Sequence, residues 1–192
     1  MPCSVFVGIS VDGFMARSDG SVGFLPDSPE PHGFTEFYSS VDAVVIGRKT
    51  YEWVVSYGEW AYGKMRVVVL SSQPLDFSPF PKARVEQMSG EPAAIVAQLA
   101  ATGAHHLYVD GGVTVQRFLR AGLIDRLIVT RVPVLIGQGI PLFGPLPHDI
   151  QLQHIATRSF PSGLVQSEYG VLPRAPAEAG TKPALADASP TP

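Results

Sequence analysis

One short segment combines the residue types that can hold a phosphate group. The apolar run 44–46 ends at Gly47, and Arg48, Lys49 and Thr50 follow where a helix is expected to begin. Glycine lets a ligand approach the backbone closely, and the unpaired N–H groups of a helix N-terminus attract an anion. The Thr50 hydroxyl can cap the helix or bond the phosphate. The segment indicates a phosphate site, although an ordinary strand-to-helix turn with surface cations fits it equally well.

Two later segments have a similar design. The apolar strand 67–70 is followed by two hydroxyls that can bond phosphate or ribose oxygens, so the residues of interest are Leu70, Ser71 and Ser72. The strand 107–109 leads into a second glycine turn and helix, formed by Asp110, Gly111, Gly112, Val113 and Thr114. Each segment alone also fits a plain turn, and none has the G-x-G-x-x-G pattern. Three such strand ends in one chain nevertheless predict a groove for a dinucleotide.

The elements that must position these residues follow from the hydrophobic periodicity. Strands are expected over residues 4–10, 43–47, 66–70, 84–88, 106–109, 125–132, 151–160 and 164–172. Helices are expected over 33–41, 91–101 and 114–121, and a further helix begins after Gly47. This order predicts an α/β fold with a central, mostly parallel mixed sheet of about eight strands, helices on both faces and a C-terminal antiparallel hairpin. The long connection 16–31 is typical of a functional lid.

Composition excludes several classes of protein. The length of 192 residues predicts one domain over 1–172, and the Ala-, Pro-, Ser- and Thr-rich end, 173–192, predicts a disordered tail. A net charge of −3 without a basic block argues against nucleic-acid binding. Cys3 is the only cysteine, and adjacent His105 and His106 face opposite sides of a strand, so no metal site is expected. The lack of a long apolar run or a signal peptide predicts no membrane association and a cytoplasmic location.

Four segments, 11–13, 47–52, 70–74 and 111–112, occur in an order that resembles the dihydrofolate reductase superfamily. The segments 122–127 and 133–137 resemble more closely the branch that contains the reductase domain of the bifunctional riboflavin-biosynthesis deaminase–reductase. The resemblance covers residues 5–172 and implies NADPH as the cofactor. It implies that Arg48, Lys49 and Thr50 meet the cofactor phosphates. Arg48, together with Ser71 and Ser72, would surround the 2′-phosphate, which a planar and always charged guanidinium suits.

The resemblance also assigns the rest of the cofactor groove. The segment 111–114 would lie along the pyrophosphate, with a cis peptide bond between Gly111 and Gly112. Gly8 and Ile9 would line the nicotinamide, and the segment 12–25 would be the lid over it.

The substrate side departs from the pattern of dihydrofolate reductases. Those enzymes carry a carboxylate at the start of the helix before the second strand, a place that falls near Pro31 or His32 here. Glu30 is the acid that could replace it, although a solvated loop carboxylate fits Glu30 as well, and Glu36 is predicted to point away from the apolar face. Thr130 lies where the superfamily often places a hydroxyl near the substrate.

Four further residues are candidates for contact with the substrate. Asp12 is either a substrate ligand near the lid or the first residue of an Asx turn. Phe34, Phe37 and Tyr38 share one face of the predicted helix, where they form an aromatic wall for a planar substrate or part of the core.

The resemblance implies an NADPH-dependent reductase that transfers hydride to a small pyrimidine- or pterin-like substrate, such as an aminopyrimidine-linked ribose. Because the expected carboxylate is missing, a nucleotide-binding sensor or regulatory protein with little reductase activity is the alternative, and a reductase of folate itself is a third. Members of this branch are often homodimers, and the low charged fraction of 16% is consistent with a buried subunit interface.

Overall fold

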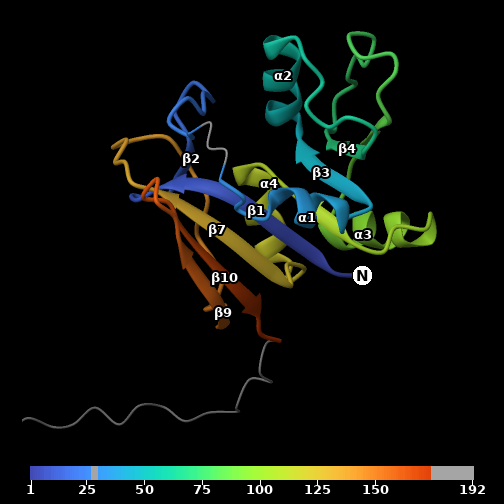
Figure 1. Ribbon diagram of the computed structural model, residues 1–192. Helices are drawn as coiled ribbons and strands as arrows, with labels where there is room; N and C mark the ends of the chain where they lie inside the picture. The colour runs from blue at the N-terminus through green and yellow to red at the C-terminus, as the bar shows by residue number, and fades with distance from the viewer. Residues whose placement is uncertain (27–29, 174–192) are drawn as a thin grey trace, which may run out of the picture.

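The computed structural model describes residues 1–26 and 30–173, which form a central sheet with a smaller sheet beside it. The central sheet has eight strands in the order β5-β4-β3-β6-β1-β7-β10-β9 (Figure 1). Its strands are β1 Cys3–Ser10, β3 Ala43–Gly47, β4 Arg66–Leu70, β5 Val85–Met88, β6 Leu107–Val109, β7 Arg126–Val132, β9 Leu152–Ser159 and β10 Val165–Val171. The pairs from β5 to β7 are parallel, and β10 is antiparallel to both β7 and β9. The predicted fold class is confirmed.

Helices cover both faces of the sheet because the strands alternate between two apolar cores. Val5, Val7 and Ile9 of β1 pack in the cluster that contains residues of α3 Pro92–Ala101 and α4 Gly112–Arg120. Phe6 belongs to the opposite cluster, which contains residues of α1 Phe34–Ser39 and α2 Arg48–Tyr57. Successive side chains on a strand point to opposite faces, so the parallel strands are apolar on both sides.

The parallel strands bring their carboxyl ends to one edge of the sheet, where ligands bind in open α/β sheets. The register places Gly47 of β3 beside Leu70 of β4, and Val45 of β3 beside Val109 of β6. Both α2 and α4 begin at this edge, immediately after β3 and soon after β6 (Figure 1). The topology therefore brings together the three strand ends that the sequence singled out.

The small sheet was not predicted. It pairs β2 Phe14–Ala16 with β8 Ile140–Pro141, and it ties the start of the predicted lid to a distant loop. The predicted tail lies outside the described residues, apart from Pro173, and stays a prediction. Within residues 1–26 and 30–173, no helix combines the length and apolar character needed to cross a bilayer.

Candidate functional site

Two helix N-termini lie side by side at the carboxyl edge of the sheet. The residue before α2 is Gly47, in an extended conformation, and the residue before α4 is Gly111, with φ +88° and ψ 130°. Neither helix has a side-chain hydrogen bond to its N-terminal N–H groups among the described residues. These donors and the positive ends of two helix dipoles make the junction suited to an anion.

The two turns approach each other so closely that only glycine fits. A Cβ atom on Gly111 would lie 2.6 Å from Thr50 Oγ1, and one on Gly47 would lie 2.9 Å from Thr114 Oγ1. Each glycine therefore faces the threonine of the other helix. Thr50 and Thr114 lie in the first turns of α2 and α4. Their hydroxyl groups and the free N–H groups of both helices therefore surround the same junction. The predicted phosphate contacts of Thr50 and Thr114 thus lie at one junction, where an anion would meet both helix N-termini.

One feature implied by the resemblance is wrong. The peptide bond between Gly111 and Gly112 is trans. The positive φ of Gly111 turns the chain instead, and α4 begins at Gly112, two residues earlier than expected. Val113, in the first turn of this helix, is 62% exposed.

Arg48 reaches from α2 toward the end of β4. Its Nε donates to Glu52 Oε1 at 2.6 Å, and its Nη1 donates to Gln73 Oε1. The loop that carries Gln73 is itself fixed, because Ser71 Oγ donates to the Gln73 carbonyl at 2.6 Å. Ser72 is exposed beside them, whereas Lys49 is exposed on α2. A guanidinium held beside two serines is well suited to a phosphate monoester.

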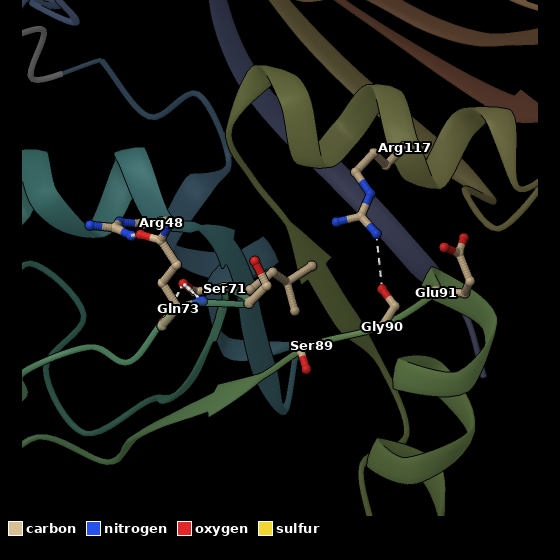
Figure 2. A pocket seen from close by; sticks show the side chains of 9 residues that line it. Arg48, Ser71, Gln73, Ser89, Gly90, Glu91 and Arg117 are labelled. Carbon is tan, nitrogen blue, oxygen red and sulfur yellow. Dashed lines mark hydrogen bonds between the residues drawn. The ribbon is translucent and has the colours of Figure 1, made fainter.

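A pocket lies beside Arg48. Its volume of about 590 Å³ is within the range of pockets that bind small molecules. It is lined by Arg48, Leu70, Ser71, Ser72, Gln73, Ser89, Gly90, Glu91 and Arg117. Figure 2 shows Arg48 and Arg117 on opposite sides of this pocket. Sequence reasoning missed the side formed by the β5–α3 loop and Arg117, although Ser89 and Gly90 follow a strand end as Ser71 and Ser72 do.

Asp110 supplies a carboxyl group next to the glycine turn. Its Oδ1 accepts a hydrogen bond from the Gly111 N–H at 2.7 Å. Burial raises the pKa of Asp110 above its ordinary value of 3.8, and the Gly111 hydrogen bond opposes the rise. Because Oδ1 is an acceptor, Oδ2 is the atom that would carry the proton in the neutral form.

Thr130 lies in a buried polar group on the face of the sheet that packs against α1. It pairs with Gly8 of β1 in the parallel register and with Gln166 of β10 in the antiparallel one. The Gln166 Nε2 group donates to both Thr130 Oγ1 and the His32 carbonyl, each at 3.0 Å. The sequence pattern did not indicate a role for Gln166. Gln166 thus ties the chain just before α1 to Thr130 on the sheet.

The predicted aromatic wall is divided between the core and the surface. Phe37 is 5% exposed and belongs to the core, whereas Phe34 is 36% exposed. Phe34 stacks on Tyr38 at a centroid distance of 5.4 Å, and it meets Phe6 edge-on at 5.3 Å. The Tyr38 hydroxyl donates to the Tyr62 carbonyl at 2.9 Å, and burial raises its pKa. Phe34 is thus the member of the set most accessible to a ligand.

The remaining predicted residues have other contacts in this structure. The backbone N–H and hydroxyl of Ser162 donate to the Glu30 carboxylate, which ties Glu30 to the β9–β10 turn. Asp12 Oδ2 accepts the N–H of Gly137 at 2.8 Å and so anchors the lid. Ile9 is buried in the core. A Cβ atom on Gly8 would lie 2.8 Å from Leu25 Cδ2, so the predicted lid does cover Gly8.

No group of three or more metal-ligating side chains occurs within the part of the chain that the structure describes. Asp42 accepts the N–H groups of both His105 and His106, each at 2.7 Å.

Comparison with known proteins identifies the family of this chain. A family model described as the RibD C-terminal domain matches residues 4–166. Uncharacterized protein YwjB of Bacillus subtilis (strain 168) is 30% identical over 160 residues, which cover 81% of this chain and 90% of that protein.

Solved structures agree with the fold. A Shewanella sp. PV-4 protein named for riboflavin biosynthesis is 35% identical, with a TM-score of 0.82 over 90% of this chain and 100% of that one. Dihydrofolate reductase from Enterococcus faecalis, complexed with NADP(H), is 16% identical, with a TM-score of 0.62 over 88% of this chain and 96% of that one. This last likeness concerns the fold alone, and it confirms the predicted dihydrofolate reductase-like architecture.

Proposed function

Because the chain belongs to the RibD C-terminal domain family, we propose that it is an NADPH-dependent reductase of a small pyrimidine- or pterin-like substrate. The observation that carries the proposal is the junction of two helix N-termini, where Gly47 and Gly111 each face the threonine of the other helix. The Shewanella relative, named for riboflavin biosynthesis, favours an aminopyrimidine-linked ribose as the substrate.

The residues at the strand ends fit the parts of NADPH. The N–H groups of the first turns of α2 and α4, with Thr50, would hold the pyrophosphate. Arg48, Ser71 and Ser72 would hold the 2′-phosphate and select NADPH over NADH. When bound, the cofactor supplies the hydride, and Gly8 and Thr130 would border the reacting ring. The protein then contributes proximity and orientation.

Reduction of a C=N or C=O bond also requires a proton for the nitrogen or oxygen atom. Burial raises the pKa of Asp110, but its hydrogen bond is to the Gly111 N–H beside the proposed pyrophosphate site. Glu30, the acid predicted from the sequence, is held at Ser162 in the hairpin turn. Water or Glu30 is therefore the proposed proton source.

Oxidation of NADPH, followed by the loss of its absorbance, tests the proposal against an aminopyrimidine ribose phosphate and against dihydrofolate. We expect oxidation with the aminopyrimidine and little with dihydrofolate, since Glu36, the carboxylate in the first turn of α1, is exposed and not buried against the sheet. Tight NADPH binding without oxidation by either substrate would favour a nucleotide-binding sensor. Failure to bind NADPH at millimolar concentration would exclude both functions.

We also propose that the protein is a homodimer. β9 is an edge strand of the central sheet, and Leu152 and Ile155 on it are exposed, as is Val165 on β10. Exposed apolar side chains on a sheet edge favour association with a second copy. Sedimentation velocity should give twice the mass of the chain, and a monomer at micromolar concentration would contradict the proposal.

A further inference from the structure

A row of four residues crosses the face of the sheet that packs against α1. In the strand register, Gly8 of β1 pairs with Thr130 of β7, Thr130 with Gln166 of β10, and Gln166 with Arg158 of β9. Figure 1 shows these four strands side by side. Neighbouring strands lie about 4.8 Å apart, so the row is about 14 Å long. It begins at the residue proposed to border the nicotinamide and ends at an arginine.

Arg158 is an exposed cation that makes no ion pair with any other residue in the ranges 1–26 and 30–173. Glu168, its diagonal neighbour on β10, is paired instead with Arg126 at 2.8 Å. Glu30 accepts the backbone N–H of Ser162 at 3.2 Å in the β9–β10 turn. The carboxylates on the neighbouring segments are thus engaged elsewhere, and the guanidinium of Arg158 keeps its full charge for an anion.

The guanidinium of Arg158 lies at the start of α1. Its Nη2 atom is 3.6 Å from the position that a Cβ atom on Gly33 would occupy. Gly33 immediately precedes α1, and the carbonyl of His32 before it accepts the hydrogen bond from Gln166. Because Gly33 has no side chain, nothing from this position covers the guanidinium. Arg158 therefore faces the same side of the sheet as Thr130 and the predicted aromatic wall.

The row offers three kinds of surface in order. Gly8 has no side chain, and Thr130 Oγ1 accepts from Gln166 Nε2, which leaves the Thr130 hydrogen to donate to a ligand. Arg158 then adds a positive charge. A pentose phosphate has the matching order of a reacting carbon, hydroxyl groups and an anion. Its C1 and phosphorus atoms are six bonds apart, about 8 Å when extended, and the arginine side chain can span the rest of the row.

We propose that Arg158 binds the phosphate group of the substrate and so selects a phosphorylated substrate over an unphosphorylated one. The inference rests on the proposed function, since it concerns the substrate of the same reaction. It assigns the far end of the substrate site to the β9–β10 hairpin, for which sequence reasoning gave no role.

Steady-state oxidation of NADPH tests the assignment with an aminopyrimidine ribose phosphate and with the same compound without its phosphate. Arg158→Ala should raise the KM for the phosphorylated compound about ten- to a hundredfold and leave kcat unchanged. Its KM for the unphosphorylated compound should equal that of the wild type. Arg158→Lys keeps the charge but loses the planar fork, so it should recover part of the loss. Arg131→Ala is the matched control, because Arg131 is also exposed but follows Thr130 on β7 and so points to the opposite face.

Equal rises in KM for both compounds would show a structural effect, and an unchanged KM for the phosphorylated compound would show no contact; either result overturns the inference while the proposed function stands. Oxidation with neither compound by the wild type would refute the proposed function. Calorimetric titration with ribose 5-phosphate and with ribose then still decides the inference. Binding of ribose 5-phosphate that is lost in Arg158→Ala supports it, and binding that survives in Arg158→Ala, or none by the wild type, refutes it.

Discussion

The junction between the two helix N-termini can be tested without any ligand, by adding one methyl group at Gly111. Gly111→Ala forces a residue with a Cβ atom to keep a φ of +88° and a ψ of 130°, which costs about 1–3 kcal/mol. The new Cβ atom would lie 2.6 Å from Thr50 Oγ1. Overpacking of this kind costs typically another 1–3 kcal/mol. The free energy of unfolding should therefore fall by about 2–5 kcal/mol.

Urea denaturation of four variants separates the two contributions. Gly122→Ala also places alanine at a positive φ, +65°, but its Cβ atom would meet nothing within 4 Å, so it should lose only about 1–2 kcal/mol. Thr50→Ala removes the oxygen atom that Gly111→Ala would strike, and the double variant should recover about 1–3 kcal/mol relative to the sum of the single variants. Additive losses, or a Gly111→Ala variant as stable as Gly122→Ala, would refute the close approach of the two turns.

Three further predictions concern charge. Arg48→Ala should weaken NADPH ten- to a hundredfold (about 1.5–3 kcal/mol) and NADH less than about twofold by calorimetry; equal losses would contradict its role at the 2′-phosphate. Glu52→Gln removes the carboxylate 2.6 Å from Arg48 Nε and should tighten NADPH about two- to fivefold at low salt, with unchanged or weaker binding as the contrary result. Burial raises the pKa of Asp110, so ionisation destabilises the fold increasingly as pH rises above 3.8 toward the raised value. Asp110→Asn should therefore raise the Tm at neutral pH by a few degrees and give no gain below the ordinary pKa; a uniform gain would contradict burial as the cause.

The strands that carry the site could be predicted well from the sequence. β3 and β4 have the expected bounds, because each is a short, continuous apolar run that ends at glycine or serine. β2 and β8 were missed because three and two residues are too few to show a period. Their pairing depends on contact between segments more than 120 residues apart, for which local sequence carries no signal.

The candidate site was predictable where it depends on local pattern and not where it depends on the neighbouring strand. The glycine and threonine residues of both turns lie in strand-to-helix segments that the sequence marks clearly. Glu91 and Arg117 join the pocket only because β5 lies beside β4 and α4 lies across from the β5–α3 loop. The expected cis bond at Gly111 came from the resemblance alone, and the positive φ of that glycine makes the turn without it.

A crystal structure with NADPH bound tests the central claim most directly. The account predicts the pyrophosphate between the N-termini of α2 and α4, within hydrogen-bonding distance of Thr50, and the 2′-phosphate beside Arg48 and Ser72. A dinucleotide bound elsewhere, or one whose phosphates avoid the two helix N-termini, would contradict the account.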